Sequence, residues 1–297
     1  MAERKTHVSN RIALLLFSVM ALLVLLDIFT GLFLKNITNL HKVLIYLVIF
    51  IIPMIVYIRA SKYKASNALR LRHFKMRYLP FVLLMGISVS LISALINAGF
   101  AAILSGFGVS VGEISSTVTF SSDSMLVVVI ANVFMPAICE ELLLRGLALG
   151  EYEKYGVAVS ILMTSLIFAL FHGSLLTLPS LFVAGVCYAV ITLLFKSVYP
   201  AMLCHIINNA IAVYISYNND YLAYLAEDVI FIIIIVVLLF IILYLTLRMT
   251  EGVIEDLGNK GRLRTNVRKL AYGDPLLSPY IWLFLALSVF TIVRNVL

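Results

Sequence analysis

The chain has 297 residues, of which 63% are hydrophobic and 12% are charged, with a net charge of +7. Soluble globular domains have roughly 25% charged residues, so this composition excludes a water-soluble protein. The excess of cations does not require a nucleic-acid partner, because lysine and arginine at a membrane surface are attracted to anionic lipids. We therefore expect an integral membrane protein whose partner is membrane lipid and not nucleic acid.

Nine apolar runs follow one another along the chain, and none has the alternating pattern of a strand. A membrane-spanning helix needs about 20 apolar residues, which most of the runs provide. Residues 158–217 leave a choice between eight and nine spans. The sequence predicts an all-α, polytopic transmembrane bundle that forms a single domain, 1–297. The runs are 12–34, 42–58, 80–105, 125–149, 158–178, 180–195, 198–217, 226–247 and 279–296.

Lysine and arginine are concentrated in alternate loops of this arrangement. The loops 59–77 and 248–269 are rich in both, whereas 106–124 and 218–225 contain neither. Cytoplasmic loops carry an excess of these residues, so we expect the N-terminus and both basic loops to be cytoplasmic. The membrane we expect is the plasma membrane of a bacterium.

The run 125–149 carries Glu140, Glu141 and Arg145 among apolar residues. Each charge near the bilayer centre costs about 2.5–3.5 kcal/mol, so these residues are expected to be paired, functional or both. Glu141 and Arg145 are four residues apart and can form an ion pair on one helix face. Glu140 points about 100° away and has no partner within the helix, which makes it a candidate general base. The alternative is a structural ion pair beside a spectator glutamate.

Two later runs add polar residues that suit the same site. His172 lies in the run 158–178, and His205 and Asn209 share one face of the run 198–217. One polar cavity inside the bundle would accommodate all of them. His172, however, lies about 21 Å from the cytoplasmic end of its run, against about 8–14 Å for Glu140 and His205. The helix therefore starts below the membrane surface, is tilted, or is broken near Gly173.

These residue types suit hydrolysis of a peptide bond. A carboxylate beside histidines can activate water, and a histidine with an amide can donate hydrogen bonds to an oxyanion. A zinc site made by Glu140, His172 and His205 is the alternative, and spacing does not decide between the two. The three cysteines, Cys139, Cys187 and Cys204, lie in apolar runs and are expected to be buried free thiols.

Three strings in chain order resemble the motifs of the CPBP family, the CAAX-processing and bacteriocin-processing (Abi) intramembrane proteases. The resemblance covers roughly residues 125–217, the expected catalytic core, and implies a helical membrane fold with a cavity reached from the cytoplasmic side. Eukaryotic members of the family remove a C-terminal tripeptide from prenylated proteins. The strings are Glu140-Glu141-x-x-x-Arg145, Phe168-x-x-x-His172 and His205-x-x-x-Asn209.

The resemblance implies a role for each of these residues. Glu140 would activate the water, His172 would assist it, and His205 with Asn209 would hold the oxyanion. Glu141 and Arg145 would brace the site. The family is commonly labelled metalloprotease, and a metal-free glutamate mechanism has also been argued for it. We favour the metal-free mechanism, because the amide of Asn209 is better suited to donate a hydrogen bond to an oxyanion than to act as a zinc ligand.

The expected function is that of an intramembrane peptidase that cleaves a membrane-associated or lipidated peptide or protein. The alternative is a non-catalytic membrane scaffold or bacteriocin self-immunity factor of the same fold. A transporter or proton relay ranks last, because it would need polar groups across the whole depth of the membrane and paired inverted repeats.

Overall fold

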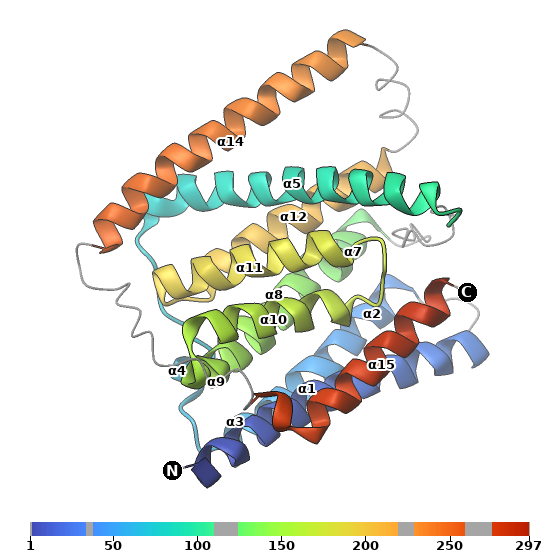
Figure 1. Cartoon of the computed structure of the whole chain (residues 1–297), viewed down its shortest axis with the longest axis vertical. Helices are drawn as coiled ribbons and strands as arrows, with labels where there is room; N and C mark the ends of the chain where they lie inside the picture. The colour runs from blue at the N-terminus through green and yellow to red at the C-terminus, as the bar shows by residue number, and fades with distance from the viewer. Residues whose placement is uncertain (1, 34–37, 110–123, 219–228, 259–274, 297) are drawn as a thin grey trace.

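The computed structural model describes residues 2–33, 38–109, 124–218, 229–258 and 275–296. Within these ranges the chain is helical and contains no strand. Figure 1 shows long helices packed side by side, with the N-terminus and the C-terminus at opposite ends of the bundle. The predicted all-α fold is confirmed.

The helices follow the predicted apolar runs closely. The long ones are α1 (Ala2–Phe33), α5 (Leu79–Gly106), α10 (Val157–Phe171), α11 (Leu178–Phe195), α12 (Tyr199–Tyr217), α14 (Val229–Gly258) and α15 (Pro279–Val296). The second span joins α2 (Asn39–Tyr46), a π-helical stretch (Leu47–Ile51) and α3 (Ile52–Ala60). The fourth joins α7 (Met125–Val129), α8 (Met135–Glu141) and α9 (Leu149–Tyr152) through π-helical stretches Ile130–Phe134 and Leu142–Ala148.

Seven of the described helical segments are long and apolar enough to cross a membrane. The remaining two predicted runs are helical as well. One forms α10, which has fifteen residues, and the other forms α12, whose apolar sequence is interrupted by His205, Asn208 and Asn209. The seven segments are Asn10–Thr30, Asn39–Ala60, Met76–Gly106, Met125–Tyr155, Leu178–Phe195, Ile233–Leu257 and Pro279–Val296.

The end of α10 resolves the question of how His172 reaches the site. The helix stops at Phe171, His172 is its C-cap, and Gly173 follows with φ +59°. A left-handed conformation after the last turn is how many helices end, and glycine adopts it without steric strain. Of the alternatives left open by the sequence, the structure has the break near Gly173.

Proline explains two of the π-helical stretches. Pro53 follows Leu47–Ile51 and Pro136 follows Ile130–Phe134. Each proline lacks the N–H that would bond the carbonyl four residues earlier, so the preceding turn widens. The third stretch, Leu142–Ala148, contains no proline and directly follows Glu140 and Glu141. Such stretches inside α-helices are frequent at functional sites.

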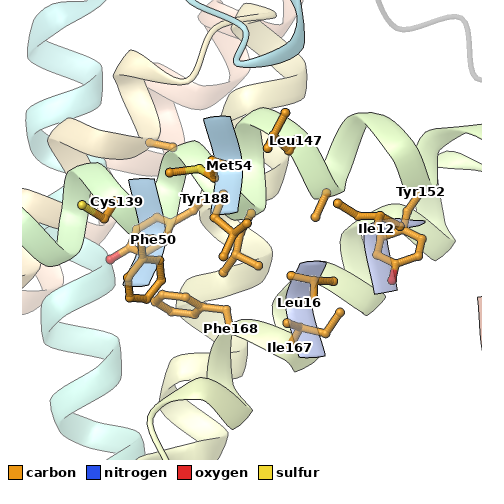
Figure 2. Packing of buried hydrophobic residues seen from close by; sticks show 14 of the residues in the cluster. Ile12, Leu16, Phe50, Met54, Cys139, Leu147, Tyr152, Ile167, Phe168 and Tyr188 are labelled. Atoms are coloured by element: carbon orange, nitrogen blue, oxygen red, sulfur yellow. The ribbon is translucent and has the colours of Figure 1, made fainter. Parts of the chain in front are cut away.

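The hydrophobic core lies between the first, second and fourth spans and α10 and α11. Figure 2 shows side chains from these elements meeting in one cluster, among them Leu16, Met54, Leu147, Phe168 and Tyr188. By contrast, α14 packs mainly against α5 at the edge of the bundle (Figure 1), and most of its side chains are exposed. An apolar helix exposed in this way suits contact with lipid.

Two glycines allow helices around the core to approach closely. A Cβ at Gly185 of α11 would lie 2.9 Å from the Cα of Ser165 in α10. A Cβ at Gly86 of α5 would lie 3.1 Å from the Cα of Cys204 in α12. Both helix pairs therefore pack backbone to backbone, which fixes α10 and α12 relative to the spans that flank them.

Polar contacts link the ends of the bundle. Arg77 and Tyr78, just before α5, both bind Asp256 near the end of α14, so the two basic segments 59–77 and 248–269 meet at one end of the molecule. Asp27 of α1 pairs with Arg294 of α15.

Candidate active site

Glu141 and Arg145 form a fully buried ion pair at the centre of the bundle. The Nη1 atom of Arg145 donates to Oε1 of Glu141 at 2.8 Å, as the four-residue spacing predicted. Its Nη2 atom donates to the carbonyl of Gly185 on α11 at 3.0 Å. A buried pair contributes to stability only when further hydrogen bonds satisfy both groups, and here a backbone carbonyl supplies one of them.

Aromatic rings enclose the guanidinium of Arg145. Its carbon lies 4.6 Å from the ring centroid of Phe168 and 5.4 Å from that of Tyr188. The negative face of an aromatic ring attracts a cation, most strongly where water is excluded. The ion pair is thus held by α10 and α11 as well as by its own helix.

His205 of α12 is oriented by the same carboxylate. Its Nδ1 atom lies 3.0 Å from Oε1 of Glu141, and its ring stacks on Tyr188 with centroids 5.2 Å apart and planes 18° apart. A carboxylate oxygen only accepts, so Nδ1 carries the hydrogen. The other nitrogen, Nε2, accepts a hydrogen bond in the neutral ring and donates one when the ring is protonated.

Glu140 has a different environment from its neighbour. Its carboxylate is buried, and Oε1 accepts a long hydrogen bond of 3.4 Å from the Tyr46 hydroxyl of α2. Its other oxygen, Oε2, lies 3.9 Å from Nε2 of His172 and has no hydrogen-bond partner among the described residues. That separation is too long for a direct hydrogen bond and is one that a water molecule can bridge.

His172 lies at the C-terminal end of α10, with its side chain 31% exposed. Its Nδ1 atom donates to the Phe168 carbonyl at 2.9 Å. The neutral ring therefore presents Nε2 to Glu140 as an acceptor. Two acceptors from different spans, Glu140 and His172, thus face each other at a partly exposed edge of the site.

Asn209 is half-buried on α12, one helical turn after His205. The structure therefore brings Glu140, Glu141, Arg145, His172 and His205 into one connected group through the contacts above. Asn209 extends the His205 face of α12 by a turn.

Sequence reasoning missed two tyrosines at this site, Tyr46 and Tyr188. Tyr46 donates to Glu140, and Tyr188 lies against both Arg145 and His205. A tyrosine in an apolar run is ordinary, since the chain has 15 of them, so neither position carried a signal. Phe168 was part of a motif string but was not selected as a site residue.

A zinc site was the alternative for Glu140, His172 and His205. No three histidine, cysteine or acidic side chains in the described ranges are grouped closely enough to hold a metal ion. The hydrogen bond from His205 Nδ1 to Glu141 leaves only Nε2 of that ring for a ligand. That single nitrogen is enough for a histidine to bind zinc, so these contacts do not decide between the metal-free and the zinc-dependent mechanism. Metal dependence stays a prediction for experiment.

The three cysteines are free thiols, as expected. Cys139 and Cys204 are buried, whereas Cys187 is half-buried and not fully buried as predicted. The thiol of Cys204 lies 3.3 Å from the carbonyl of Val82 on α5. These contacts agree with a packing role.

Comparison with known proteins gives one family. Residues 122–211 match the family described as type II CAAX prenyl endopeptidase Rce1-like. The match begins just before α7 and ends within α12, so it covers all three motifs and less than half of the chain. No curated protein and no solved structure matches the chain. Together with seven apolar helices, the match identifies an integral membrane protein. The segment that carries the three motifs is therefore similar to the CAAX protease family, as the sequence motifs predicted.

Proposed function

We propose that the protein is an intramembrane endopeptidase in which Glu140 activates a water molecule to cleave a membrane-associated or lipidated peptide or protein. The main support for this proposal is the 3.9 Å separation between Oε2 of Glu140 and Nε2 of His172. A water molecule between two acceptors can donate one hydrogen to each, which leaves an oxygen lone pair free for attack. The exposed side of His172 gives a peptide access to that position.

The reaction follows from these positions. Glu140 accepts a proton from the water as the oxygen bonds to the carbonyl carbon of the peptide. The carbonyl oxygen gains the negative charge, and His205 and Asn209 donate hydrogen bonds to it. Collapse of this intermediate breaks the C–N bond, and Glu140 returns its proton to the leaving amine.

The buried pair of Glu141 and Arg145 supports the reaction without contacting the substrate. Since Nδ1 of His205 is bound to Glu141, only Nε2 faces the oxyanion, and it donates there when the ring is protonated. Glu141 and Arg145 are positioning residues in this scheme.

The test compares the peptides released from membranes that carry wild-type protein, Glu140→Gln, or the control Glu255→Gln. Glu255 is exposed on α14 and lies outside the site, so Glu255→Gln makes the same chemical change as Glu140→Gln at a remote position. We expect Glu140→Gln to lower cleavage by about 10²–10⁴-fold at equal protein abundance, as loss of a general base does. Retained cleavage would reject the proposal. A cellular phenotype that survives both Glu140→Gln and His205→Ala would favour the scaffold or immunity function.

Metal dependence is tested separately on the purified, active protein. We expect activity to persist after chelation and dialysis, with no stoichiometric metal detected by elemental analysis. Activity that is lost on chelation and restored by zinc would replace the metal-free mechanism with a zinc-dependent one.

A further inference from the structure

A second feature of the molecule is a cavity of about 770 Å³ at the end of the bundle. Its walls come from the loop 61–75, from the fourth span around α9, and from the α11–α12 connection. The wall residue Leu147 lies seven positions after Glu140, or about 10 Å along the helix, so the cavity is separate from the carboxylate site. Six cationic side chains line it: Lys62, Lys64, Arg70, Arg72, Lys154 and Lys196.

The charges of this cavity are not balanced. Its two carboxylates are already paired, Glu151 with Lys154 and Glu153 with Arg70. The other four cations form no ion pair within the described ranges, and all four are exposed. A cavity with so large an excess of positive charge attracts an anion, and its walls reduce screening by solvent.

Backbone conformation singles out the same cavity. Within the described ranges, three residues other than glycine have positive φ: Lys62 (55°), Arg70 (54°) and Lys196 (53°). All three line the cavity, and each follows the end of a helix: α3, α4 (Ala65–Ala68) and α11. Glycine is the usual residue at such a position, because other residues are strained there.

A cation at a helix C-terminus also compensates the partial negative charge of the last carbonyls. That effect accounts for a lysine or arginine at any one of these ends. It does not account for three helix ends that bring strained cations to one cavity. The further cations Lys64 and Arg72, which line the same cavity, have no ion-pair partner in the part of the chain that the structure describes. Strained backbone is typically retained at binding sites.

The wall formed by the loop is fixed by backbone contacts. The N–H of Val198 donates to the carbonyl of Arg70 at 3.2 Å, and the hydroxyl of Ser197 donates to the carbonyl of Arg72. A Cβ at Gly146 would lie 3.1 Å from the Cα of Leu69, so the loop rests directly on the fourth span. The backbone that carries the cations of the loop is therefore fixed before any ligand arrives.

The depth of the cavity indicates which anion it meets. Three membrane-spanning segments end beside it, at Ala60, Tyr155 and Phe195, which places it at the level of the lipid headgroups. Lysine and arginine together are the side chains that bind phosphate. We propose that this cavity binds a phosphate group, supplied by the headgroup of an anionic lipid. The proposal does not depend on peptidase activity.

The test measures lipid binding to the purified full-length protein by native mass spectrometry, with phosphatidylglycerol and phosphatidylcholine as probes. The variants are Lys196→Gly and Lys62→Gly, in which glycine suits the positive φ, so we expect both to fold. Lys75→Gln is the matched control, because Lys75 is exposed in the same basic loop and lies outside the cavity. We expect each glycine variant to bind phosphatidylglycerol roughly fivefold more weakly, at a thermal midpoint no lower than that of the wild type.

Three outcomes would overturn the proposal: equal retention of both lipids, unchanged binding in Lys196→Gly, or an equal loss in Lys75→Gln. A parallel titration with inorganic phosphate separates the sources of the anion. Binding of phosphatidylglycerol that phosphate does not displace supports the lipid headgroup. Phosphate binding that is weakened in Lys196→Gly and excludes the lipid would overturn the lipid assignment in favour of a free anion.

Discussion

Glu140 and Glu141 are adjacent in the chain and both are buried, yet their surroundings differ. Glu141 is fully enclosed and binds a cation and a histidine through one oxygen. Glu140 has only a long hydrogen bond from Tyr46 and faces His172 across a gap. The contrast shows how one helix separates two tasks, because successive side chains point about 100° apart. One carboxylate organises the interior, and the other is left available for chemistry.

The largest expected difference in stability separates the two glutamates. Glu141→Gln leaves Arg145 buried without a counter-charge, which typically costs about 3–5 kcal/mol. The same change at Glu140 leaves no buried cation unpaired, and we expect it to cost less than about 1 kcal/mol. Thermal unfolding of the two purified variants in detergent measures the contrast. Equal midpoints would show that the Glu141 network does not stabilise the fold.

A smaller effect is expected at the contact between α10 and α11. Gly185→Ala places a Cβ within 2.9 Å of the Ser165 Cα, so the helices must separate and the carbonyl that accepts from Arg145 must move. Overpacking of this kind costs about 1–3 kcal/mol. The control is Gly99→Ala in α5, where a Cβ meets nothing within 4 Å. We expect the control to gain about 0.5–1 kcal/mol from helix propensity. Similar thermal midpoints for the two variants would contradict the close packing described above.

The smallest effect concerns the partner of Glu140. Tyr46→Phe removes only the hydroxyl that donates at 3.4 Å, and a hydrogen bond of ordinary strength contributes about 1 kcal/mol. We expect cleavage to change by no more than about fivefold while the thermal midpoint stays the same. Tyr214→Phe, at an exposed position of α12, is the control. A loss as large as that of Glu140→Gln would make Tyr46 a participant in the chemistry.

Much of this arrangement was predictable because charge is expensive in an apolar helix. Glu140, Glu141 and Arg145 stand out in their run for that reason, and the four-residue spacing fixed the ion pair. The nine apolar runs likewise predicted the helices, since length and composition suffice to identify a span. The free-energy cost of placing charge in an apolar helix is what made these residues identifiable from the sequence.

Site residues whose burial in an apolar helix costs little free energy could not be identified from the sequence. Tyr46 and Tyr188 are ordinary in apolar helices, and only tertiary packing brings them to the carboxylates. The end of α10 at Phe171 was one of several alternatives, because the apolar pattern continues beyond it. The π-helical stretch Leu142–Ala148 has no proline or other sequence mark, so periodicity alone predicted a regular helix.

That stretch has a consequence for how the chain tolerates insertions and deletions. A π-turn holds one residue more than an α-turn, so the segments on its two sides are rotated relative to a regular helix by about 100°. The two glutamates precede it, and Gly150 follows it, where an added Cβ would lie 3.3 Å from the Arg70 guanidinium of the loop. Loss of one residue within Leu142–Ala148 would restore a regular helix and turn the carboxylates away from their partners while the loop stayed seated. The rotation of one half of this span relative to the other about the helix axis therefore depends on the single extra residue in the π-helical stretch.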